Sequence, residues 1–276
     1  MRGVAAIISA VALQACAPLP PAVDDGERIV SIDYCADQML LGMVQTNRIA
    51  AVSKDVASDP DFSLKRVGGI PRVRPEIEAV LALRPTLVVR SYGGGPRFAE
   101  AMESAGVRVF TLPYAASFAD IDASLAEAGR ALDAEQRATT LRRELQETLT
   151  EARQLSARGA PAKALYVTPG DVTTGPGSLI ADLLALAGYT SVETQPGWHR
   201  LPLEQLTRTK PDIIVRAFFE SPNHRQDRWS SAEHRALAEA VRDVPQVTVS
   251  GSELACGNWR VGHALQRIAT ARKDSL

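Results

Sequence analysis

Two arginines occupy matched positions in a segment that occurs twice along the chain. The first copy runs from Glu78 to Arg90, and the second runs from Glu204 to Arg216. Each copy has an acidic residue, then a basic residue followed by proline, then an apolar run that ends in arginine. The pattern predicts a short helix that feeds a buried parallel strand, so both arginines should lie where such sheets bind ligands. Paired guanidinium groups in one cleft would suit an anion, and an intraprotein ion pair or a solvated strand end is the alternative.

Aromatic side chains make up only 5% of the chain, yet several follow predicted strands at one expected edge of the sheets. Aromatic residues in a cleft bind flat or apolar ligand surfaces, although any single one could belong to the core of a lobe. The predicted ligand site therefore combines the two arginines with Tyr34, Tyr92, Trp198, Phe218 and Trp259.

The N-terminus has the pattern of an export signal, with Arg2 followed by an apolar run and then a proline-rich stretch. The sequence Leu-Gln-Ala-Cys at 13–16 resembles a bacterial lipobox, which predicts lipidation of Cys16. Cleavage by ordinary signal peptidase is the alternative, and it would leave a soluble periplasmic protein.

An exported chain meets an oxidising compartment, where the two other cysteines, Cys35 and Cys256, could form a disulfide. They lie in the first and last predicted elements, so the bond would tie the two halves together across the cleft. Two unpaired, buried thiols are the alternative.

Several classes of function find no support in the sequence. The formal net charge of −1, without a long basic run, argues against binding of nucleic acid. All four histidines lie in the second half, so a metal site shared by both halves is not predicted. No catalytic arrangement with recognisable local context is present. The stretch 174–178 lacks the spacing of a nucleotide-binding loop and is better explained as a turn with Ser178 as a helix N-cap.

Strands alternate with helices through both halves, which is typical of doubly wound parallel sheets. Between the halves, residues 133–158 contain no glycine or proline and have apolar residues at helical spacing, which predicts one long, rigid helix. We therefore divide the chain into an export signal and tail (1–25), an N-terminal α/β lobe (26–130), an interdomain helix (131–160) and a C-terminal α/β lobe (161–276). Further helices are predicted over 231–241 and after Trp259.

Over residues 27–272 these features resemble the substrate-binding proteins of ABC importers for vitamin B12 and ferric siderophores. The resemblance rests on the export signal, the strand-loop-helix opening, the repeated segment and the single long helix. It implies two doubly wound α/β lobes joined by one long helix, as in class III periplasmic binding proteins, with a chelate in the groove between them. It also implies that Glu78 and Glu204 dock onto arginines of the permease, whereas simple stabilisation of two helix N-termini is the alternative.

The resemblance further implies a non-enzymatic periplasmic protein that hands its ligand to an ABC-importer permease. The protein would sit on the outer face of the inner membrane if Cys16 is lipidated. We expect a monomer without a cofactor or a resident metal. Because Arg90 and Arg216 bring charge that a cobalamin binder does not require, the predicted ligand is an anionic ferric siderophore or similar metal chelate, with cobalamin as the alternative.

Overall fold

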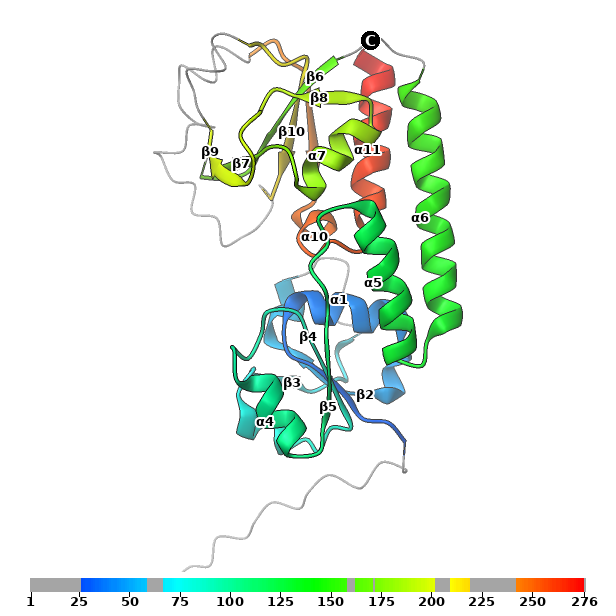
Figure 1. The fold of residues 1–276 in the computed structure, drawn as a ribbon, viewed down its shortest axis with the longest axis vertical. Helices are drawn as coiled ribbons and strands as arrows, with labels where there is room; N and C mark the ends of the chain where they lie inside the picture. Colours follow the sequence, from blue (N-terminus) through cyan, green and yellow to red (C-terminus); the bar gives the residue numbers. More distant parts are fainter. Residues whose placement is uncertain are drawn as a thin grey trace, which may run out of the picture.

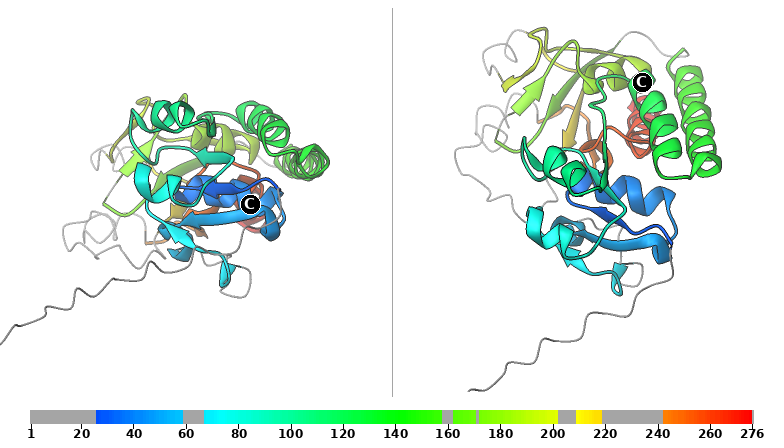
Figure 2. Two further views of the ribbon diagram at one scale, coloured as in Figure 1. Left: turned by 90° about the horizontal axis from the view of Figure 1, so that it is seen from below. Right: turned by 60° about the horizontal axis from the view of Figure 1, so that its bottom comes forward.

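The chain folds into two α/β lobes that are stacked end to end, with long helices running beside both (Figures 1 and 2). The computed structural model describes residues 26–58, 67–157, 162–170, 172–201, 209–218 and 242–275. The predicted helix over 231–241 and the helix of the second repeated segment lie outside these ranges. None of the helices in the described ranges is long and apolar enough to cross a membrane.

The first lobe is built on a five-stranded sheet in which all neighbouring strands are parallel. The strand order is β3-β2-β1-β4-β5, which changes direction beside β1 and so creates a ligand-binding switch point. The strands are β1 (Ile29–Ser31), β2 (Ile49–Ser53), β3 (Arg72–Val73), β4 (Leu87–Arg90) and β5 (Arg108–Thr111). The helices of this lobe are α1 (Tyr34–Met43), α3 (Ile77–Leu81) and α4 (Phe98–Ser104).

The second lobe repeats this topology on a four-stranded parallel sheet of order β11-β10-β6-β8. Its strands are β6 (Ala162–Val167), β8 (Tyr189–Ser191), β10 (Ile213–Ala217) and β11 (Gln246–Val249). The lobe also contains α7 (Leu179–Leu186), α10 (Gly251–Leu254), α11 (Val261–Ser275) and an antiparallel pair, β7 (Val172–Thr174) and β9 (Trp198–Arg200). The strands of the repeated segment, β4 and β10, hold equivalent positions in the two sheets. The prediction of two doubly wound lobes is confirmed.

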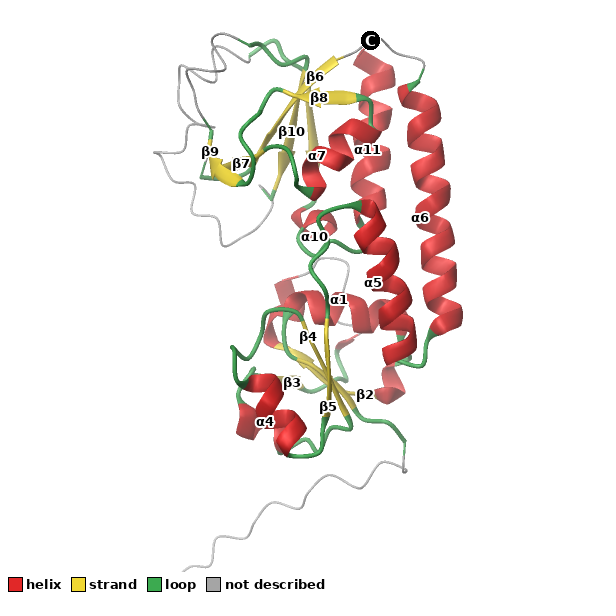
Figure 3. Cartoon of the chain, viewed as in Figure 1, coloured by secondary structure: helices red, strands yellow, loops and turns green. Residues whose placement is uncertain are grey.

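One long helix joins the lobes, as predicted, and a shorter helix that was not predicted runs beside it (Figure 3). The predicted long helix is α6 (Glu135–Ser156), and its buried residues are the five whose spacing indicated it, namely Ala138, Leu141, Leu145, Leu149 and Ala152. It packs along α5 (Phe118–Ala131), which begins at the N-cap Ser117. A Cβ at Gly129 would lie 2.6 Å from the Ala138 Cβ, so this glycine allows the close approach of the two helices.

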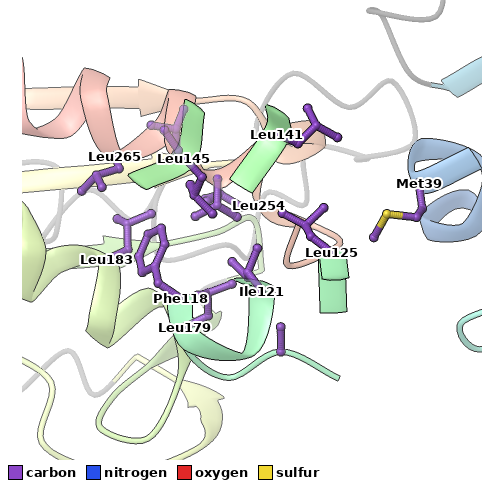
Figure 4. Close-up of a cluster of buried hydrophobic side chains, with 14 of the residues drawn as sticks. Met39, Phe118, Ile121, Leu125, Leu141, Leu145, Leu179, Leu183, Leu254 and Leu265 are labelled. Carbon is purple, nitrogen blue, oxygen red and sulfur yellow. The ribbon is translucent and has the colours of Figure 1, made fainter. Parts of the chain in front are cut away.

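One continuous apolar core runs through both lobes and the connecting helices. Figure 4 shows how α5, α6, α7, α10 and α11 each contribute leucine, isoleucine or phenylalanine side chains to it, with Met39 of α1 nearby. Smaller clusters cover the outer face of each sheet. Because close-packed interiors resist deformation, the shared core fixes the orientation of the lobes.

Candidate functional site

A cleft with a volume of about 510 Å³ lies between the lobes, within the usual size range of small-ligand sites. The first lobe contributes Ser91, Tyr92 and Tyr114 from the loops that follow β4 and β5. The second lobe contributes Tyr166, Trp198 and Phe218. Among the described residues that line it, none carries a charged side chain.

Three aromatic side chains in the cleft are unusually accessible. Tyr92, Tyr114 and Trp198 are 61%, 79% and 55% exposed, and they are the large hydrophobic side chains found at the surface within the described ranges. All three line the same cleft. The ring of Trp198 meets the ring of Tyr166 edge to face, with 6.2 Å between their centroids. A cluster of exposed apolar surface of this kind is typical of a ligand-binding site.

A buried carboxylate holds the loop that carries Tyr92. One oxygen of Asp33 accepts a hydrogen bond from the backbone N–H of Ala36 (3.0 Å) and so caps α1. The other oxygen accepts from the backbone N–H groups of Ser91 (2.6 Å), Tyr92 (3.2 Å) and Gly93 (3.0 Å). Asp33 is 1% exposed, so its side chain is shielded from water, and hydrogen bonds to a buried carboxylate are strong.

The phenol of Tyr92 has a raised pKa, although its side chain is largely exposed. Partial desolvation raises its pKa, and the charges of Asp33, Asp55 and Asp37 raise it further, against the opposing effect of a hydrogen bond from the backbone of Tyr34. A neutral phenol can stack on a ligand and hydrogen-bond to it.

The β7–β9 pair holds Trp198 at the other wall of the cleft. Trp198 lies opposite Thr174 in the antiparallel register. The neighbouring His199 places its Nε2 3.2 Å from a carboxylate oxygen of the buried Glu193. A Cβ at Gly175 would lie 2.2 Å from the Gln195 carbonyl oxygen, so only glycine fits there.

The stretch 174–178 is the predicted turn with an N-cap. The Ser178 hydroxyl oxygen accepts from the backbone N–H of Ala181 (3.2 Å) at the start of α7.

The structure does not bring Arg90 and Arg216 together in the cleft, and neither side chain lines it. Arg90 donates to the Gly95 carbonyl oxygen (3.1 Å) and lies over the ring of Phe98, at 5.9 Å. Arg216 donates to the side chain of Gln246 (3.3 Å) on β11. Both arginines lie near the ends of their strands, as predicted. The prediction that they clamp a ligand is wrong, because both side chains lie on the sheet faces that carry the outer clusters.

The predicted aromatic residues separate into two groups. Tyr92, Trp198 and Phe218 line the cleft, and Gly251 leaves room for the Phe218 ring, which would lie 2.3 Å from an added Cβ. Tyr34 and Trp259 do not line it. Tyr34 accepts a hydrogen bond from the Gln38 side chain (3.0 Å), and Trp259 packs against α1 where Gly42 leaves space. These last two residues support the junction between the lobes.

Cys35 and Cys256, whose pairing the sequence left open, are joined by a disulfide. Both cysteines line the cleft, at the place where α1 of the first lobe meets the segment that follows α10 of the second. Of the remaining predicted residues, Glu78 is exposed in the first turn of α3. Glu204 and Cys16 lie outside the described residues.

Tyr114, Tyr166 and Asp33 belong to this site but were not predicted from the sequence. Tyr114 follows β5 much as Tyr92 follows β4, so its position after a strand was a usable signal. Tyr166 lies inside a strand, where it was indistinguishable from core. Asp33 preceded a predicted helix and could have been identified as an N-cap, but its contacts with the loop at 91–93 depend on the tertiary fold.

Among the described residues, no group of three or more histidine, cysteine, aspartate or glutamate side chains is placed to hold a metal ion.

A second buried carboxylate, Asp37, makes stability depend on pH. It accepts hydrogen bonds from Ser31 and from both the backbone and the hydroxyl of Ser53, yet burial dominates and raises its pKa to about 6. The folded protein therefore binds this proton more tightly than the unfolded chain does, so the resulting stabilisation is complete below pH 3.8 and is lost as the pH rises through about 6. We expect a loss of roughly 3 kcal/mol across this window, relative to Asp37→Asn.

Urea unfolding of the wild type and of Asp37→Asn at intervals from pH 4 to pH 8 tests this. The difference between the two free energies of unfolding should fall with rising pH and then level off. Parallel curves would show that Asp37 titrates normally.

Comparisons with known proteins agree with this architecture. The family described as "Periplasmic binding protein" matches residues 29–227. A curated relative, the "Uncharacterized ABC transporter substrate-binding lipoprotein YvrC" of Bacillus subtilis (strain 168), is 25% identical over 206 residues. That alignment covers 69% of this chain and 65% of the relative, so the match spans just under two thirds of the relative's length.

Three solved structures share the fold at low sequence identity. The periplasmic heme-binding protein RhuT from Roseiflexus sp. RS-1 gives a TM-score of 0.70 at 19% identity, covering 91% of this chain and 99% of its own. The periplasmic vitamin B12-binding protein BtuF of Vibrio cholerae gives 0.67 at 17% identity, covering 90% and 97%. An ABC-type Fe3+-hydroxamate transport system protein from Saccharomonospora viridis DSM 43017 gives 0.67 at 19% identity, covering 90% and 94%.

Proposed function

Because the chain belongs to the periplasmic binding protein family, we propose that it is the substrate-binding component of an ABC importer. In this role it captures a metal chelate in the interlobe cleft and delivers it to a membrane permease. The family consists of binding proteins, so the chain is not an enzyme. The observation that carries the proposal is that Tyr92, Tyr114 and Trp198, all exposed, line one cleft between the lobes.

The chemistry of the cleft favours a ligand with a flat, uncharged face. The three structural relatives are described as proteins for heme, vitamin B12 and Fe3+-hydroxamate, which are all metal chelates. Aromatic rings on both walls suit stacking against such a ligand, and the lining residues in the described ranges offer no charge to pair with an anion. We propose a ferric siderophore or similar chelate with little exposed charge. Cobalamin is the alternative, and the position of the arginines outside the cleft removes the argument against it.

We also propose that the protein works outside the cytoplasm, on the outer face of the inner membrane, through a lipid on Cys16. The motivation is the lipobox-like sequence at 13–16, together with the description of the Bacillus subtilis relative as a lipoprotein. A diacylglyceryl cysteine in the intact mass of protein from the membrane fraction is the signature of that anchor. A soluble mature form that lacks it would contradict the proposal.

Removal of either exposed ring from the cleft is expected to weaken ligand binding. We expect Tyr92→Ala and Trp198→Ala each to lower affinity roughly 5- to 150-fold, because burying one aromatic face stabilises a complex by roughly 1–3 kcal/mol. Isothermal titration calorimetry with a ferric hydroxamate siderophore, haem and cyanocobalamin measures this effect and also identifies the ligand class.

Arg90→Ala and Arg216→Ala are the matched controls, since both arginines lie outside the cleft. Their affinities should equal that of the wild type, and binding should depend only weakly on salt. If binding is lost in both arginine variants and falls steeply with salt, the ligand is an anion held by these residues, contrary to the proposal.

A further inference from the structure

The disulfide between Cys35 and Cys256 lies inside the proposed ligand site and also joins the two lobes. Its cysteines belong to α1 and to the segment after α10, and both line the cleft. A ligand in the cleft would therefore rest against the bond, and a small reductant could reach the bond through the cleft. The disulfide is thus a further connection between the lobes, in addition to the helices α5 and α6.

Hydrogen bonds reinforce this connection at the same place. The amide nitrogen of Gln38 donates to the Ser252 carbonyl oxygen (2.9 Å), and its amide oxygen accepts from the Asn258 side chain (2.7 Å). Gln38 is completely buried and Asn258 is 2% exposed. We call Cys35, Gln38, Ser252, Cys256 and Asn258 the interlobe brace.

The brace also fixes residues that shape the cleft. Ala255 and Gly257, on either side of Cys256, line the cleft, as does Leu254. Trp259 packs into the space above Gly42 of α1. If the covalent bond opens, the segment 255–259 keeps only hydrogen bonds and packing to hold it against α1, so this wall of the cleft can move.

We propose that the Cys35–Cys256 bond is a thiol–disulfide exchange site within the cleft, and that its reduction weakens ligand binding by releasing the segment 255–259 from α1. The co-reactant is a dithiol. One thiolate of the dithiol attacks a cysteine Sγ and displaces the other, forming a mixed disulfide. The second thiol then displaces the first cysteine, so that the protein gains two electrons and two protons and the dithiol leaves as its own disulfide.

Redox state and ligand binding are then linked in both directions. If reduction lowers affinity by a given factor, bound ligand must make the disulfide harder to reduce by the same factor. The effect on affinity depends on the proposed function, whereas the loosening of the brace does not.

The first experiment therefore needs no ligand. Wild-type protein is reduced with dithiothreitol without denaturant, desalted under argon and compared with the oxidised protein by hydrogen–deuterium exchange. We expect faster exchange in residues 34–43 and 251–259 and unchanged exchange in β4 and β10. Unchanged exchange in both segments, with free thiols verified by titration, would overturn the proposal.

The second experiment measures affinity for haem, a ferric hydroxamate siderophore and cyanocobalamin in both redox states. The probe that binds the oxidised protein should bind the reduced protein at least tenfold more weakly. Cys35→Ser/Cys256→Ser should show the weak affinity before and after dithiothreitol treatment. Equal affinity in the two redox states overturns the proposal. If none of the probes binds oxidised protein, the proposed ligand class fails, and hydrogen exchange alone decides whether the brace loosens.

Discussion

Replacement of Asp33 by alanine is expected to lower the free energy of unfolding by at least about 3 kcal/mol, and to weaken ligand binding at the same time. The substitution removes the N-cap of α1 and the acceptor for three further backbone N–H groups at 91–93. A lost cap costs roughly 1 kcal/mol, and a buried donor left without an acceptor costs about 1–3 kcal/mol. The bond from Gly93 is buried, whereas those from Ser91 and Tyr92 are partly buried and contribute less. Because the loop carries Tyr92, its relaxation also removes one wall of the ligand site.

Urea denaturation and calorimetric titration of Asp33→Ala measure the two effects. The matched control is Asp120→Ala, since Asp120 also accepts a backbone N–H, from Ala116 (3.0 Å), but lies in solvent. Water can replace an exposed acceptor, so the control should lose little stability and no affinity. An equally small effect at Asp33 would mean that another group or water satisfies the loop.

The architecture could be predicted because it depends on local and repeated sequence patterns. The segment repeated at Glu78 and Glu204 predicted equivalent strands, and β4 and β10 do take equivalent places in the two sheets. The spacing of the apolar residues of α6 named all five of its buried residues. The neighbouring α5 was missed, although Ser117 caps it and Phe118, Ile121 and Leu125 have helical spacing. The spacing of apolar residues in α5 indicates a helix as clearly as the spacing in α6 does.

The prediction that Arg90 and Arg216 hold a ligand in the cleft was wrong, for a reason that can be found in the sequence. Side chains alternate between the two faces of a strand, so Arg90 shares a face with Val88, and Arg216 shares a face with Ile214. Val88 and Ile214 belong to the clusters on the outer faces of the sheets, while Val89 and Val215 face the core between the lobes. Both arginines therefore point away from the cleft for the same reason. The repeat correctly predicted the positions of both arginines along the chain. It also puts both side chains on the same face of their sheets, which is the face away from the cleft.

The rest of the site depends on contacts between residues that are far apart in the sequence. The side chain of Gln38 meets Ser252 and Asn258, and Cys35 meets Cys256, only because the lobes pack together at α1 and α10. Nothing in the local sequence around Gln38 distinguishes it from any other buried helix residue. Trp259 was predicted to contact ligand from its type and its position after a strand, yet that position also suits a residue that fills the junction between the lobes.

Replacement of both Glu78 and Glu204 by alanine is expected to abolish uptake and leave ligand affinity unchanged. The two glutamates begin the two copies of the repeated segment, and Glu78 is exposed in the first turn of α3, on an element that does not line the cleft. One matched carboxylate on each lobe would orient the protein on a permease that presents arginines at a fixed spacing. Exposed ion pairs contribute little affinity, so the pair would act by selecting the productive orientation.

Uptake of the bound probe by cells that carry the cognate permease, measured beside calorimetric affinity, tests this docking role. Glu144→Ala/Glu151→Ala is the matched control, because it removes the same charge from two exposed positions on α6. The control should transport normally if docking depends on position rather than on net charge. Normal uptake by the Glu78 and Glu204 double variant would exclude both residues from docking. Loss of ligand binding in that variant would instead indicate that one of the two glutamates contacts the ligand. Glu78 is exposed on α3, which does not line the cleft, so Glu204 would be the candidate.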